Sequence, residues 1–97
     1  MARNVRESED EPTKAQLAHL VRQAVTRNGL SQRAAAGLMG IDQPKTSSLM
    51  RGRLMGFSAG RLMRFLVALG HDVDVTVRPK PRNRARGRIR VIGEDQT

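Results

Sequence analysis

The 97 residues suffice for one small domain, and 18 Lys and Arg against 9 Asp and Glu give a net charge of +9. The lack of cysteine excludes disulfides and thiolate metal sites and is typical of a reducing compartment, so we expect a cytoplasmic protein. No apolar run is long enough for a membrane span or a secretory signal, and the strongly basic balance favours a polyanionic partner.

The N-terminal residues 1–12 are mixed in charge and become acidic toward their end, and we expect them to be disordered. A first helix is predicted from about Lys14 to Asn28, with Thr13 as its N-cap and Gly29 after its end. Within this helix, apolar side chains recur at helical spacing and predict a buried face. They are Leu17, Val21, Ala24 and Val25.

Residues 30–52 have the pattern of two short helices joined by a glycine turn. Ser31 is a natural N-cap for the first helix, and Gly40 supplies the left-handed backbone that ends it. Asp42 caps the second helix, whose first turn tolerates Pro44 because the missing N–H does no harm there. The first turn of this second helix is polar and free to meet DNA, as in a helix-turn-helix.

A fourth helix is predicted after Phe57 and the N-cap Ser58, ending at Gly70. The next residues alternate apolar and polar side chains, which predicts a half-buried strand over about residues 72–78. Because the chain offers this strand no good partner, we expect it to pair with the same strand of a second copy across a two-fold axis. A hairpin with residues 89–92 is the alternative, and both pairings could coexist. The apolar residues of the strand, and so the predicted dimerisation residues, are Val73, Val75 and Val77.

Residues 80–97 are predicted to form a basic flexible arm, because prolines and a glycine interrupt a run of cations that contains no acid. The sequence leaves three roles open for this arm, which are contact with DNA phosphates, contact with a protein partner, and solvation alone. The domain organisation we expect is therefore a disordered segment 1–12, a helix-turn-helix domain 13–79 and the basic arm. The cations of the run are Arg78, Lys80, Arg82, Arg84, Arg86, Arg88 and Arg90.

The two-helix segment resembles the Cro/cI-like (XRE) helix-turn-helix family. The positions of the family pattern are occupied by Ser31, Gln32, Ala36, Gly40, Ile41, Thr46, Ser47, Leu49 and Gly52. The continuation through Arg51-Gly52-Arg53 and Phe57-Ser58 into residues 68–77 is similar to the branch that contains HigA-type antitoxins, over roughly Lys14–Pro79. The chain departs from the pattern at Thr46, where valine or isoleucine is usual, and at Met50, where glutamate is common.

Eight residues form the predicted DNA-contacting surface. In the second short helix, the glutamine would match the edge of adenine and the lysine the edge of guanine in the major groove. The proline of the same helix would contact a thymine methyl group. The arginines beyond that helix would contact phosphates, and the resemblance gives the glutamine of the first helix a phosphate contact as well. The alternative is an ordinary solvated helix face. The set is Gln32, Gln43, Pro44, Lys45, Ser47, Ser48, Arg51 and Arg53.

The resemblance implies a mainly α fold, a four- to five-helix Cro/cI-like domain whose C-terminal β-strand pairs across a homodimer. It further implies a repressor that binds a palindromic operator and neutralises a small HigB- or RelE-like ribonuclease toxin. The alternative is a stand-alone XRE-family regulator with no toxin partner. For a basic toxin, the acidic run Glu7–Glu11 would be a better contact than the basic arm, although a solvated terminus is the simpler interpretation.

Other functions find little support in the sequence. His19 and His71 are the only histidines, and neither a nucleophile motif nor a glycine-rich phosphate loop occurs. We therefore expect no enzyme, no metal site and no cofactor. Because the two aromatic residues, Phe57 and Phe65, fall on apolar faces, base stacking on single strands is disfavoured and double-stranded DNA is the expected partner.

Overall fold

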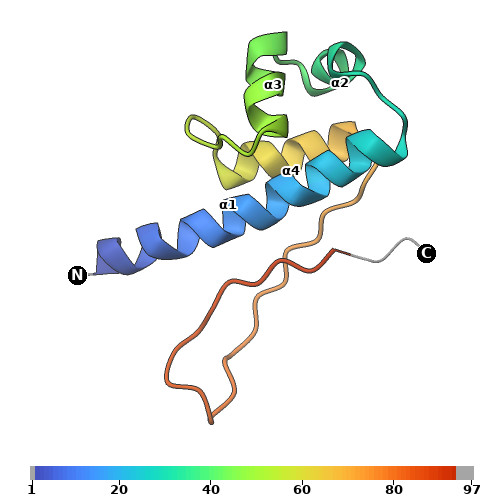
Figure 1. Cartoon of the computed structure of the whole chain (residues 1–97). Coiled ribbons are helices and arrows are strands. Elements are labelled where there is room, and N and C mark those ends of the chain that lie inside the picture. Colours follow the sequence, from blue (N-terminus) through green and yellow to red (C-terminus); the bar gives the residue numbers. More distant parts are fainter. Residues whose placement is uncertain (1, 94–97) are drawn as a thin grey trace.

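The computed structural model describes the backbone of residues 2–93 and the side chains of residues 11–93. Its four helices are α1 (Ala2–Arg27), α2 (Gln32–Met39), α3 (Gln43–Met50) and α4 (Ala59–Ala68). Helices α1 and α4 lie side by side, with α2 and α3 on one side of this pair (Figure 1). Residues 71–93, which we call the C-terminal extension, leave the body on the other side (Figure 1). None of the described helices combines the length and apolar character needed to cross a membrane.

The hydrophobic core lies between α1 and α4 and is closed by α2 and α3. Val21 of α1 and Leu62 of α4 are fully enclosed, and the predicted apolar stripe of α1 is buried along its whole length. Phe57 packs edge-on against Phe65, with the ring centroids 6.0 Å apart. The predicted mainly helical fold with a helix-turn-helix is therefore confirmed, with four helices in the described residues.

The start of α1 differs from the prediction. The helix begins at Ala2 rather than Lys14, so it includes most of the segment that we expected to be disordered. Thr13 is buried inside the helix instead of capping it, and Pro12 also lies inside. The prediction gave too much weight to these two local signals. The Glu and Arg residues before them favour helix, and a helix that is already anchored in the core extends more easily than a new one forms.

The three short helices begin at the predicted N-caps. Side-chain oxygens of Ser31, Asp42 and Ser58 accept backbone N–H groups at 3.0, 2.8 and 3.1 Å. Gly40 ends α2 with a φ of 72°, in the left-handed region as predicted. Isolated helices of 8 to 10 residues are marginal in water, so these caps and the packing of one face define where each helix lies.

Replacing Asp42 with alanine should lower the free energy of unfolding by about 1 kcal/mol, because the N–H of Lys45 loses its acceptor. Asp42→Asn is the matched control, since asparagine caps as well as aspartate and removes only the charge. Urea unfolding followed by circular dichroism gives both values. If asparagine destabilises as much as alanine, the negative charge at the start of α3 is the stabilising feature and the hydrogen bond is not.

The predicted strand is not formed in a single copy of the chain. Residues 71–80 have no regular secondary structure, and no residue among the described ones is part of a β-ladder. The extension turns where the N–H of Arg84 donates to the carbonyl of Pro81 at 3.3 Å, and it then runs back toward α1 (Figure 1). The alternative hairpin is therefore not formed either. Val75 and Val77 are 74% and 91% exposed, and their pairing with a second copy stays a prediction.

Candidate nucleic-acid interface

The turn between α2 and α3 fixes the angle at which α3 leaves the body. The N–H groups of Gly40 and Ile41 both donate to the carbonyl of Ala36, at 2.8 and 3.1 Å. Ala36 is buried, as expected for a small residue where two helices approach closely. Ile41 is half-buried against the core. The turn is thus held by hydrogen bonds on one side and by apolar packing on the other.

The inner face of α3 anchors the helix in the core. Leu49 and Thr46 are both 0% exposed. The hydroxyl of Thr46 donates to the carbonyl of Asp42 at 2.9 Å, so it is buried with its hydrogen bond made. This bond explains why threonine is tolerated at a position where valine or isoleucine is usual in the resembling family.

The outer face of α3 carries the predicted base-reading residues. Gln43, Pro44 and Lys45 are exposed in its first turn, and Ser47 and Ser48 are half-buried further along. Within the described part of the chain, the side chains of Gln43 and Lys45 make no hydrogen bond or ion pair. They are therefore available to a ligand that approaches α3 from outside. Their contacts to DNA stay a prediction.

The predicted phosphate-contacting residues flank this surface. Gln32 is exposed in the first turn of α2, and Arg51 and Arg53 are exposed directly after α3. Neither arginine is paired with a described acidic residue. The structure thus keeps all eight predicted residues on α2, α3 and the segment just beyond α3, with only the two serines half-buried.

Two arginines that were not predicted from the sequence hold α3 and the loop after it in place. Arg22 of α1 reaches across to donate to the carbonyl of Leu49 at 3.4 Å, which ties the end of α3 to α1. Arg61 lies over the rings of Phe57 and Phe65, 5.5 and 5.6 Å from their centroids. Arg61 and Phe65 lie four residues apart on α4, a spacing that brings side chains together on a helix and could have revealed their contact.

The same arginine also holds the loop after α3. Arg61 donates from Nη1 to the carbonyl of Gly56 at 3.4 Å. Gly52 and Gly56 adopt φ values of 82° and 90°, which side chains other than glycine rarely adopt. The path of the loop that carries Arg53 is therefore set by two glycines and one arginine.

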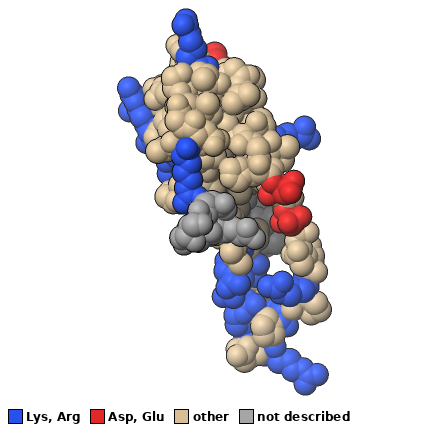
Figure 2. Space-filling view, turned by 90° about the vertical axis from the view of Figure 1, so that its right-hand side faces the viewer, with Lys and Arg blue, Asp and Glu red and all other residues tan. Residues whose placement is uncertain are grey.

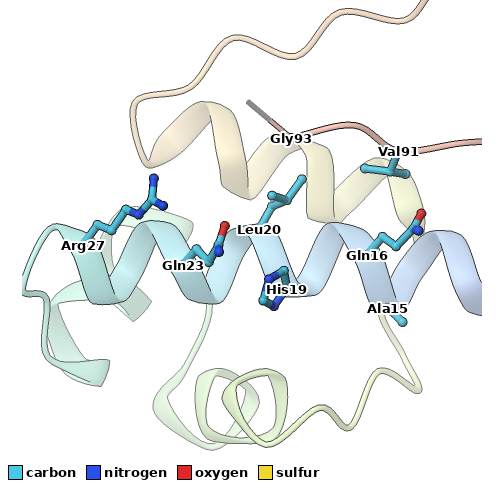
Figure 3. A pocket seen from close by; sticks show the side chains of 8 residues that line it. All are labelled: Ala15, Gln16, His19, Leu20, Gln23, Arg27, Val91 and Gly93. Atoms are coloured by element: carbon cyan, nitrogen blue, oxygen red, sulfur yellow. The ribbon is translucent and has the colours of Figure 1, made fainter. Parts of the chain in front are cut away.

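An open groove of about 500 Å³ lies on α1, on the side that the C-terminal extension crosses (Figure 3). The groove is lined on α1 by residues that include His19, Gln23 and Arg27, and on the extension by Val91 and Gly93 (Figure 3). In the described part of the chain, no three His, Cys, Asp or Glu side chains come close enough to hold a metal ion.

Comparisons with known proteins agree with this geometry. A family model described as a helix-turn-helix domain matches residues 4–78. A solved structure described as an XRE-family transcriptional regulator shares 45% identity and superposes with a TM-score of 0.87, covering 91% of this chain and 99% of its own. No curated protein matches significantly. Because residues 1–70 are too few to make up 91% of the chain, the likeness extends beyond the helices into the C-terminal extension.

Proposed function

Because this chain belongs to the XRE-type helix-turn-helix family of DNA-binding regulators, we propose that it is a repressor that reads one specific operator in double-stranded DNA. The observation that carries the proposal is the two-sided character of α3. Thr46 and Leu49 lock its inner face into the core, while its first turn presents unpaired polar side chains to solvent. A rigid helix with a free polar first turn is what a recognition helix needs in the major groove.

Within this surface we assign two kinds of contact. Gln43 and Lys45 read base edges, with Pro44, Ser47 and Ser48 beside them. Gln32, Arg51 and Arg53 bind phosphates and set the register of α3 on the duplex. Residues 13–79 form the DNA-binding unit in this proposal, and residues 80–97 form a separate basic arm.

We further propose that the repressor acts as a homodimer joined by residues 72–78. In a single copy these residues have no regular secondary structure, their backbone makes no hydrogen bond within the described chain, and Val75 and Val77 are largely exposed. Backbone and valines are therefore open to pairing with a strand of another molecule. Pairing with the same strand of a second copy would bury the valines and place two α3 helices about a two-fold axis.

The duplex upstream of the gene for this chain is the natural test of repression. Fluorescence anisotropy should show tight binding to this duplex and weaker binding to a shuffled duplex of equal length and composition, at one fixed salt concentration. Equal affinity for both duplexes would refute sequence-specific repression of its own operon.

The finer assignment is an antitoxin of a type II toxin–antitoxin operon that also represses that operon. It is supported by the similarity of residues 14–79 to the HigA-type branch. A stand-alone XRE-family regulator is the alternative. Co-expression with the product of the neighbouring gene separates the two, because an antitoxin should form a stable complex with a small HigB- or RelE-like ribonuclease and restore growth. A neighbour that neither binds nor inhibits growth leaves the stand-alone regulator.

A further inference from the structure

The C-terminal extension carries a basic run with a cation at every second position from residue 78 to residue 90. Seven cations occur in this basic run, and no acidic residue interrupts them. The residues between them are small, apolar or turn-forming, with Pro79 and Pro81 disfavouring a helix. Figure 2 shows Lys and Arg side chains gathered densely over the part of the molecule below the helical body.

The basic run lies far from the recognition surface. Helices α2 and α3 sit above the α1–α4 pair in Figure 1, whereas the extension hangs below it. Figure 2 is turned about the vertical axis and again has the arginine-rich part at the bottom, so the two views agree on this separation. A straight duplex lying on the outer face of α3 therefore does not also lie on the basic run of the same protomer.

The cations of the basic run have few partners within the chain. All are exposed except Arg84, which is half-buried and donates from Nη1 to the carbonyl of Arg86 at 3.0 Å. No carboxylate among the described residues pairs with any of them. Seven like charges on one short segment repel one another, and a polyanion would relieve this repulsion.

The chemistry of the basic run favours the backbone of a duplex. The basic run turns at residues 82–86, so its cations are gathered on one exposed loop and are not spaced along a regular strand. Such a cluster suits phosphates, whose contacts carry no sequence information. Readers of single strands stack bases on aromatic rings, but the described aromatics Phe57 and Phe65 are both buried in the body.

We propose that the basic run is a second duplex-binding surface, separate from α3, which binds phosphates without reading sequence. With α3 on one duplex and the basic run on another, one molecule can hold two DNA segments together. Only the binding of the first duplex by α3 rests on the proposed function. The basic run would bind any second duplex, whatever sequence α3 reads.

The first test compares the salt dependence of binding to a random-sequence duplex. The arm variant carries Arg82→Gln, Arg86→Gln and Arg88→Gln. The matched control carries Lys14→Gln, Arg27→Gln and Arg64→Gln, which remove the same charge from α1 and α4. Substitution is preferable to truncation because Val91 and Gly93 pack against α1.

Losing three phosphate contacts should make the slope of log K against log salt shallower by about 2 to 3 for the arm variant, and the control should keep the wild-type slope. Equal slopes for the arm variant and the wild type would overturn the proposal. So would an arm variant that keeps its duplex affinity but loses affinity for polyglutamate, since the basic run would then serve an acidic protein.

The second test asks for two duplexes at once. The protein is loaded onto an immobilised duplex, and a second, labelled duplex is offered in solution. Wild type and matched control should capture the labelled duplex, whereas the arm variant should stay on the immobilised one and capture several-fold less. If the arm variant captures as much as wild type, two α3 helices do the bridging and the basic run does not. The two proposals can fail separately. If the wild-type protein shows no operator preference but the arm variant still captures less of the second duplex, the proposed repressor is refuted and the second surface stands.

Discussion

Replacing Val75 with proline should dissociate the proposed dimer and abolish tight operator binding while leaving the four helices folded. Proline would remove one ladder donor and leave the facing acceptor unpaired in the proposed intermolecular sheet. Val75 is 74% exposed in the single copy and lies outside the core, so the change has little in the monomer to disturb. Two half-sites bind with useful affinity only when they are linked, so loss of the dimer removes the gain of the second half-site.

A charged residue at the same position gives a second route to this result. Val75→Asp should also weaken the dimer, because burying a valine side chain stabilises by about 1.5–3 kcal/mol and a carboxylate cannot replace it. Val67→Asp on α4 is the matched control, since Val67 is an exposed valine outside the extension. Light scattering reports the oligomeric state, and circular dichroism reports the helices. If both Val75 variants remain dimeric and bind operator, pairing through residues 72–78 must be abandoned.

Replacing Gln43 or Lys45 with alanine should weaken operator binding by about 1–3 kcal/mol, or roughly 5- to 150-fold in affinity. Binding to random DNA should weaken less, because base-edge contacts contribute mainly on the right sequence. Both residues are exposed and make no hydrogen bond through their side chains within the described chain, so folding should be unaffected.

Fluorescence anisotropy on both duplexes at one salt concentration measures this difference. Gln16→Ala is the matched control, because Gln16 is an exposed glutamine of α1, away from the outer face of α3. Equal losses on operator and random DNA would reassign Gln43 and Lys45 to the phosphate backbone and remove the recognition role of α3.

Residues 30–70 could be predicted from the sequence because their signals are local. Ser31, Asp42 and Ser58 each cap the helix that follows them, and Gly40 takes the left-handed backbone that the sequence required. These features depend on neighbours three or four residues away, so no knowledge of the tertiary fold is needed.

The features that the sequence did not reveal depend on distant or competing interactions. The hydrogen bond from Arg22 to the carbonyl of Leu49 joins residues 27 positions apart, and no local sequence pattern predicts it. At Pro12, a local helix-breaking signal competes with an adjoining helix that is already anchored in the core, and the helix continues. The strand predicted over residues 72–78 needs a partner that the described chain does not supply, so it is not formed in a single copy and its pairing with a second copy stays a prediction.

The most direct test of the account is selection of bound sequences from a random duplex library with the purified full-length chain. A dimer that reads DNA through two α3 helices should enrich a pseudo-palindrome whose half-sites are centred about 10 base pairs apart, or a multiple of one helical turn. The Gln43→Ala variant should relax the preference at the same position in both half-sites. A library that stays random, or one that yields a single asymmetric site, would contradict the account.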